Sequence, residues 1–362
     1  MKSEFKEKFK CEKQTFIWNC WGKDVEQGKI NRRSFLINSF LPSALVQHPP
    51  KRNNHTYTIL YNKTRAFSLY ERIIYLPNKA KHYSDVRSTY YREINLSLIE
   101  LKNLDYDNIE DLLFVCSHKM LEDPVHQEGM QLKRKWLKEM LSKIGSVAKI
   151  AYYKGKPVGQ ILYFPEEIEK TKLTKRKGVL WINCVYNPFK EAQRLGIGRK
   201  LVENLIEDCR KGRACGLKTV KFVLAKAFNT GEALSLPDFY RRLGFLRPPT
   251  SENSNALYKP VSGEYEPCPP KEGYVPLPED RNKAVVFYSP ICQFSYPFAV
   301  EIKELIREVA PELPIEIINE WEHPEEAIKR KNHWLVVNAK PIYTFFKAEE
   351  QFKNEVKQAL ES

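Results

Sequence analysis

An apolar strand, a turn with two glycines and an amphipathic helix follow one another over residues 178–210. The strand (178–186, GVLWINCVY) shows little alternation of apolar and polar residues, which is typical of a strand covered on both faces of its sheet. The helix (198–210) repeats its apolar residues every three or four positions, so one side of it packs on that sheet. The sequence therefore predicts an α/β fold in which helices flank a central sheet.

Further elements on both sides extend this unit to residues 96–262. Two strand patterns at 147–153 and 157–164 are separated by only three residues, a spacing that predicts a β-hairpin. Asp107 opens a helical pattern and has a side chain suited to an N-cap. The expected elements are strands at 96–102, 147–153, 157–164 and 219–226, and helices at 107–117, 127–143 and 237–243.

A proline-rich segment, residues 263–282, separates this unit from a second one at residues 283–362. Six prolines fall between positions 260 and 278, which indicates an extended linker. The second unit has the order strand, helix, strand, helix, two strands and a helix, which fits a small thioredoxin-like α/β domain. Its expected strands are 283–289, 315–319, 334–338 and 341–346, and its expected helices are 298–309, 323–331 and a last one from 348.

Residues 1–95 carry most of the positive charge of the chain. They hold 18 Lys and Arg against 8 Asp and Glu, a balance of +10 within a net charge of +14. Three interpretations compete: a basic arm for RNA, an irregular accessory domain, or an extension upstream of a start near Val86. We favour the last two. Because the remaining chain is nearly balanced, a nucleic-acid partner is not expected.

Composition narrows the class of protein. No apolar run approaches the roughly 18–20 residues of a membrane helix, and the first residues lack the apolar core of a signal peptide. The 8 cysteines include no paired C-x-x-C motifs, so neither a disulfide scaffold nor a zinc site is expected. These features predict a cytoplasmic protein with no membrane partner and no metal.

The sharpest local motif is the turn Gln193-Arg194-Leu195-Gly196-Ile197-Gly198. Glycines at the start of a helix allow a ligand to approach the backbone, and the unpaired N–H groups there favour a phosphate. The spacing is neither G-x-G-x-x-G nor a Walker A loop, which disfavours a dinucleotide or P-loop site. An ordinary strand-to-helix turn is the alternative interpretation of these six residues.

The wider context resembles the GNAT N-acetyltransferase superfamily. The resemblance covers residues 96–262 and depends on the Q-x-x-G-x-G turn followed by the short helix with Phe239-Tyr240-Arg241-Arg242-Leu243-Gly244-Phe245. Together with the domain order, several short stretches are similar to a YoaP-like branch of that superfamily, which has a small C-terminal domain. They are 132–137 (LKRKWL), 164–167 (FPEE), 181–185 (WINCV) and 288–297 (YSPICQFSYP).

That resemblance implies acetyl-CoA as co-substrate and an amine on a small molecule or peptide as acceptor. Backbone N–H groups of the turn would bind the pyrophosphate, and Tyr240 would protonate the departing thiolate. A tyrosine, with an ordinary pKa near 10, is a plausible donor to a thiolate of pKa about 8.5. The pantetheine arm would pair with the strand residues Ile182, Asn183, Cys184 and Val185.

The general base is harder to place. Many GNAT enzymes carry a glutamate on the strand that matches 179–185, but here that strand has no carboxylate. Glu166 and Glu167 are the nearest carboxylates, and Glu167 is the catalytic candidate. The alternative interpretation is that both glutamates lie in a solvated loop and have no catalytic role. Cys184 is either an acyl-accepting nucleophile or, as we favour, an inert core residue. His118 and His126 are assigned to the surface.

In the C-terminal unit, Cys292 begins a C-x-x-S motif near the start of a helix, where a thiolate is stabilised. The motif has no second cysteine, and Asn332 and His333 occupy the place of the usual cis-proline, which favours a non-redox module. The sequence therefore predicts an N-acetyltransferase with direct transfer from acetyl-CoA. The alternative is a non-catalytic acyl-CoA-binding or redox-linked interaction protein; the acceptor and the oligomeric state stay open.

Overall fold

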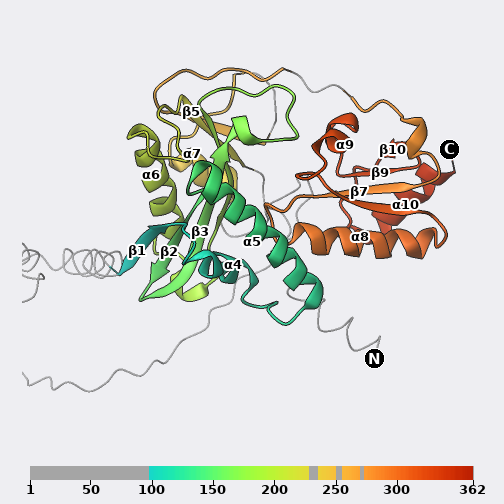
Figure 1. Ribbon diagram of the computed structural model, residues 1–362, viewed down its shortest axis with the longest axis horizontal. Helices are drawn as coiled ribbons and strands as arrows, with labels where there is room; N and C mark the ends of the chain where they lie inside the picture. Colours follow the sequence, from blue (N-terminus) through green and yellow to red (C-terminus); the bar gives the residue numbers. More distant parts are fainter. Residues whose placement is uncertain (1–97, 228–234, 250–254, 270–272, 362) are drawn as a thin grey trace, which may run out of the picture. The chain divides into compact units, whose positions relative to one another are not determined.

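A computed structural model describes residues 98–227, 235–249, 255–269 and 273–361 (Figure 1). The expected N-terminal region, residues 1–95, lies outside these ranges. All described residues belong to one compact unit of the chain. No helix within the described ranges is long and apolar enough to cross a membrane.

The first sheet has six strands in the order β1-β2-β3-β4-β5-β6. The pair β4–β5 is parallel and every other neighbouring pair is antiparallel, so the sheet is mixed. The hairpin predicted from the sequence is the pair β2–β3. The strands are β1 (Ile99–Asn103), β2 (Ala148–Tyr153), β3 (Lys156–Pro165), β4 (Val179–Tyr186), β5 (Phe222–Lys226) and β6 (Ala256–Pro260).

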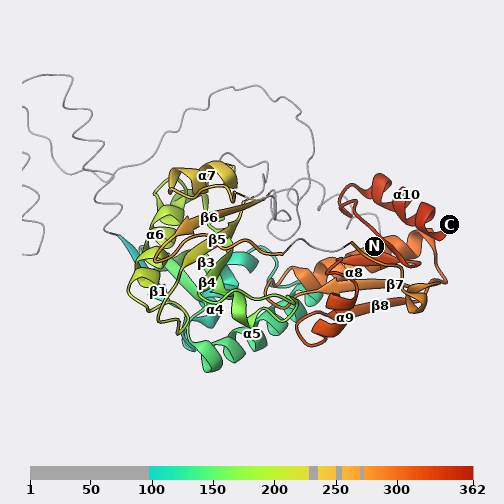
Figure 2. The same cartoon turned by 90° about the horizontal axis from the view of Figure 1, so that it is seen from above.

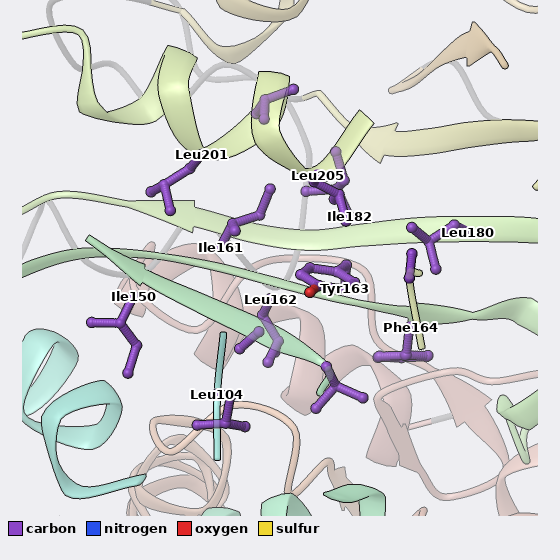
Figure 3. Packing of buried hydrophobic residues seen from close by; sticks show 14 of the residues in the cluster. Leu104, Ile150, Ile161, Leu162, Tyr163, Phe164, Leu180, Ile182, Leu201 and Leu205 are labelled. Carbon is purple, nitrogen blue, oxygen red and sulfur yellow. The ribbon is translucent and has the colours of Figure 1, made fainter. Parts of the chain in front are cut away.

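Helices cover both faces of this sheet, which confirms the predicted α/β fold. Figure 2 shows α6 and α4 on opposite faces of the strands. In Figure 3, Leu201 and Leu205 point from α6 toward Ile161 and Ile182, while Leu162 lies on the other face. The helices of this part are α4 (Ile109–Ser117), α5 (Pro124–Ile144), α6 (Ile197–Arg210) and α7 (Leu236–Arg242).

Several boundaries differ from the sequence prediction for local reasons. The N-cap of α4 is Asn108 rather than Asp107, because the Asp105 carboxylate accepts the N–H groups of both residues in a tight turn. Helix α5 begins at Pro124, since Asp123 accepts the N–H of His126 and caps it. Strand β6 was not predicted from its short sequence; its pairing with β5 makes it a strand.

A second sheet has four strands in the order β10-β9-β7-β8. Strands β7 and β8 are parallel, whereas β9 is antiparallel to both β7 and β10. The element order is the predicted one, although β10 is only two residues long. The elements are β7 (Ala284–Tyr288), α8 (Ser295–Val309), β8 (Ile315–Asn319), α9 (Pro324–Lys329), β9 (Leu335–Val337), β10 (Lys340–Pro341) and α10 (Glu349–Leu360).

The segment just before α8 packs tightly against α4 and α5. Gln293 is buried, and its amide nitrogen donates to the backbone oxygen of Leu113 at 3.0 Å and to the Ser117 hydroxyl. A Cβ placed on Gly129 of α5 would lie 2.1 Å from the Gln293 carbonyl oxygen. The glycine in the middle of α5 is therefore required by this close approach of two backbones.

A tryptophan after β8 extends the same contact. Trp321 is buried within the hydrophobic core of the first sheet, with its ring 5.8 Å from Trp136 and 6.5 Å from Phe164. Lys170 donates to the Trp321 backbone oxygen at 3.0 Å and lies over its ring. Both contacts join the first sheet to the segment that follows β8.

We expect Gly129→Ala to destabilise the protein by about 2 kcal/mol, because the added methyl group collides with the Gln293 carbonyl. In an open helix the same change stabilises by about 1 kcal/mol. Urea unfolding of the full chain measures the difference, and Gln131→Ala on the exposed side of α5 is the control. A stabilised Gly129 variant would show that the two backbones do not meet in solution.

Candidate functional site

Strands β4 and β5 diverge partway along their length. Their parallel pairing runs from Val179 to Ile182 on β4 and ends there, although β4 continues to Tyr186. At the same point the register between β3 and β4 shifts, so that Leu162 faces Cys184 and Asn183 is the extra residue of a β-bulge. A strand edge that has left its neighbour offers backbone groups to an extended ligand.

The glycine turn leads directly into α6, as predicted. Gly196 is the N-cap with φ of 78°, and Arg194 has φ of 62°, so the chain turns sharply before Ile197. The Lys200 N–H bonds the Gly196 carbonyl at 2.9 Å, which leaves the N–H groups of residues 197–199 ahead of the first helical bond. These groups form a backbone site suited to an anion.

Tyr240 lies in α7 and is only 2% exposed. Its ring centroid is 5.1 Å from that of Phe239 and 5.0 Å from that of Phe245. Burial, and to a smaller extent the Cys184 thiol, raise the pKa of Tyr240 well above its usual range. The structure thus brings Tyr240 near Cys184 on the diverging part of β4, and the phenol stays protonated at neutral pH.

A cavity of about 530 Å³ is lined by residues from the parts of the chain that form the first and the second sheet. From β3, alternate residues line it, since the residues between them face α6. From the second sheet, the segment before α8 and the residue after β8 complete the wall. Lining residues are Gln160, Leu162, Phe164, Asn183 and Cys184 on the first side and Cys292, Gln293, Glu320 and Asn332 on the second.

Four cysteines, Cys116, Cys184, Cys268 and Cys292, line this cavity. Burial raises the pKa of Cys116 to about 11 and raises the pKa of Cys184 still further, partly offset in each case by the Lys133 charge. At neutral pH both groups are neutral thiols, which agrees with the interpretation of Cys184 as a core residue. Cys292, in the segment before α8, lines the same cavity as Cys184.

Glu166 is not solvated, which corrects the sequence prediction. It lies in the short 3-10 helix η2 (Glu166–Ile168), is fully buried, and binds Arg176 at 2.8 Å, Lys172 at 3.0 Å and the Trp181 indole at 2.7 Å. Burial raises the pKa of Glu166, but these partners outweigh it and lower the pKa to about 2. A carboxylate held this way is a poor base.

Glu167, the catalytic candidate predicted from the sequence, is half-buried in η2. One of its carboxylate oxygens lies 3.5 Å from the Gly178 nitrogen. The residues that line the cavity include neither Glu167 nor Tyr240. Its role as a base stays a prediction.

His126 is buried, not at the surface as expected. Its Nε2 lies 2.7 Å from the Ser117 hydroxyl, and its ring packs on Phe294 at 4.6 Å. Burial lowers the pKa of His126 to about 4, so the ring is neutral at pH 7. His118 is half-buried, with its ring centroid 4.6 Å from that of Phe189.

Sequence reasoning missed several polar residues of the cavity. Lys133 is 2% exposed and lies on the buried side of α5 with Trp136 and Leu137. A charged residue at that position of the apolar repeat was a signal that could have identified it. No local sequence pattern indicated Glu320, because it follows a strand of the second sheet and lies near residues of the first sheet only in the tertiary structure.

Among the residues in the described ranges, no group of three or more His, Cys, Asp or Glu side chains is placed to hold a metal ion.

Residues 107–245 match the family model described as "Acetyltransferase (GNAT) family". The match covers less than half of the chain, so it defines a domain and not the entire protein. A comparison with the sequences of curated proteins finds no match. On the family match, the chain contains an α/β GNAT-superfamily acetyltransferase domain.

Solved structures with a similar part include Ard1 from Thermoplasma volcanium, at 15% identity over 45% of this chain and 98% of that one, with a TM-score of 0.31. A GNAT family acetyltransferase from Brucella melitensis in complex with acetyl-CoA shares 15% identity over 47% and 91%, with a TM-score of 0.31. The ribosomal-protein-S18-alanine N-acetyltransferase from Escherichia coli shares 15% over 46% and 97%, with a TM-score of 0.31. The assignment of the domain rests on the family match alone.

We expect Glu166→Gln to lower the free energy of unfolding at pH 7 by about 3 kcal/mol, because it leaves the buried Arg176 charge without its carboxylate. The folded pKa of Glu166 lies below its ordinary value of 4.5. Its stabilising contribution is therefore present above pH 4.5 and is lost as the pH falls toward 2.

Urea unfolding across this pH range measures the effect, and the neighbouring Glu167→Gln is the matched control. The gap between the unaltered protein and the Glu166 variant should close at low pH. Equal stability of the two glutamine variants at pH 7 would contradict the role given to Glu166.

Proposed function

We propose that this protein is an acetyl-CoA-dependent N-acetyltransferase that transfers the acetyl group directly to an amine on a small molecule or peptide. The observation that carries the proposal is the end of the β4–β5 pairing at Ile182, together with the N–H groups at the start of α6 that precede its first helical bond. A single extended ligand with an anionic end fits both features.

Acetyl-CoA has that shape and charge. Its pyrophosphate would be held by backbone N–H groups of Leu195, Gly196, Ile197 and Gly198, next to Gln193 and Arg194 in the same turn. Its pantetheine amides would pair with the β4 edge over Ile182, Asn183, Cys184 and Val185. Both sets are the ones that the sequence predicted.

Tyr240 is the proposed general acid. The tyrosine is buried near Cys184, at the divergent end of β4, where the thioester would end. A thiolate leaving into this apolar surrounding needs a proton, and the Tyr240 phenol is protonated at neutral pH. The burial that raises the pKa of the phenol would also raise that of a thiol beside it, so proton transfer between them stays possible. Acyl transfer through a Cys184 intermediate is not proposed, because burial keeps that thiol neutral.

The domain division is also part of the proposal: an acetyltransferase domain at 96–262, a linker at 263–282, and a YoaP-like, thioredoxin-like domain at 283–362. The parallel β7–β8 pair with antiparallel β9 and β10 supports the thioredoxin-like assignment. All six described cysteines are thiols, not disulfides, which is typical of a reducing compartment and supports a cytoplasmic location.

Turnover distinguishes this function from a non-catalytic acyl-CoA-binding or redox-linked interaction protein, which the family match does not favour. The full chain is mixed with acetyl-CoA and a panel of primary amines, and the CoA thiol is measured. Thiol release that requires an amine supports the transferase. Binding of acetyl-CoA without release would support the alternative.

We expect Gly198→Glu to weaken acetyl-CoA binding on the order of tenfold or more, because it adds a negative charge where the pyrophosphate should meet the helix. Gly198→Gln has similar size without the charge and should weaken binding less. A Cβ alone has room 3.4 Å from the Phe239 ring, so Gly198→Ala is the control. Equal calorimetric affinities of the Glu and Gln variants would contradict an anion site at this turn.

We expect Tyr240→Phe to lower the single-turnover rate constant about a hundredfold, since it removes the proton donor. Acetyl-CoA affinity should stay the same, because the ring contacts with Phe239 and Phe245 remain. An unchanged rate, with the chemical step shown to be rate-limiting, would return Tyr240 to a packing role.

A further inference from the structure

We infer that Glu320, which follows β8 of the second sheet, removes the proton from the ammonium group of the acceptor inside the shared cavity. This inference rests on the proposed acetyl transfer and assigns its general base. Residues 179–186 of β4 include no carboxylate, so that strand cannot supply the base. Glu166 is bound to Arg176 and Lys172 and cannot supply it either.

Glu320 is close to the point where β4 and β5 diverge. Its backbone N–H donates to the Tyr288 carbonyl at 3.0 Å, which fixes the residue at the end of the second sheet. It lines the cavity together with Asn183 and Cys184. Lys226, the last residue of β5, is near enough for its charge to act on the Glu320 carboxyl group. Glu320 therefore faces the divergent ends of both strands.

The surroundings of Glu320 make it a stronger base than an exposed carboxylate. Burial and the like charge of Glu169 raise the pKa of Glu320, and the Ser289 hydroxyl and the Lys226 charge offset part of this rise. Lys331 also lines the cavity. A raised pKa brings a carboxylate closer to the proton affinity of an amine, which is what a general base near neutral pH requires.

The cavity also presents buried amide oxygens that accept no hydrogen bond from the described residues. They are the side-chain oxygens of Gln160, Gln293 and Asn332. In each residue the amide nitrogen is already bound: to the Cys116 sulfur at 2.8 Å, to the Leu113 carbonyl at 3.0 Å and to the Thr171 carbonyl at 3.1 Å, respectively.

Those bonds fix the orientation of the three amide groups, so that each oxygen can accept a hydrogen bond from a ligand in the cavity. A buried oxygen without a donor costs about 1–3 kcal/mol, so a ligand or water is expected to supply the donors. An ammonium group is a donor with no acceptor atoms. It complements both these oxygens and the carboxylates of Glu169 and Glu320.

The proposed reaction balances as follows. The acceptor ammonium gives one proton to the Glu320 carboxylate, which releases it to solvent. The amine nitrogen then bonds to the thioester carbon, and the carbon–sulfur bond breaks with its electron pair left on sulfur. Tyr240 protonates the thiolate and is reprotonated by the second proton lost from nitrogen. The net products are the acetylated amine, CoA thiol and one proton.

The test is Glu320→Gln in the full chain, with benzylamine and aniline as acceptors at pH 7. Benzylamine is an ammonium ion at that pH, whereas aniline is already a neutral amine. We expect the single-turnover rate constant to fall on the order of a hundredfold with benzylamine and far less with aniline. Acetyl-CoA affinity, measured by calorimetry, should not change. Glu320→Asp should restore part of the rate with benzylamine.

Glu316→Gln is the matched control, because Glu316 is an exposed residue of the same strand and binds Lys283 at 3.0 Å outside the cavity. Equal losses with both amines, or no loss with benzylamine, would overturn the assignment of Glu320. If the unaltered protein transfers acetyl groups to neither amine while binding acetyl-CoA, the proposed function fails instead.

Discussion

The end of the parallel pairing between β4 and β5 is the constraint on which the site depends. Ile182 is the last paired residue of β4, and the bulge at Asn183 turns the following residues away from β5. This opening exposes a strand edge on the α6 side and admits the cavity on the other. The proposed roles of the N–H groups at the start of α6 and of the buried Tyr240 in binding and protonating the co-substrate depend on this opening beside them.

Two close contacts hold the second sheet against the first and so let it form part of the cavity wall. Gly129 allows the Gln293 carbonyl to approach α5, and Trp321 enters the core of the first sheet. The segment before α8 places Cys292 and Gln293 in a wall of the cavity.

Environment assigns different roles to chemically identical glutamates. Glu166 is held by Arg176, Lys172 and Trp181, which lower its pKa and make it a structural ion. Glu320 is half-buried in the cavity wall, where burial and the neighbouring carboxylate of Glu169 raise its pKa. The two residues differ in which charges surround them, and this difference separates a stabilising group from a proposed base.

The sequence by itself determined the order of the helices and strands other than β6, and the position of the glycine turn, because both follow from local spacing along the chain. It also identified the GNAT resemblance through that turn and the helix with Tyr240. Only the tertiary structure decided the burial of Glu166 and His126 and the place of Glu320 in the cavity. These depend on contacts between residues distant along the chain, where local periodicity contains no information.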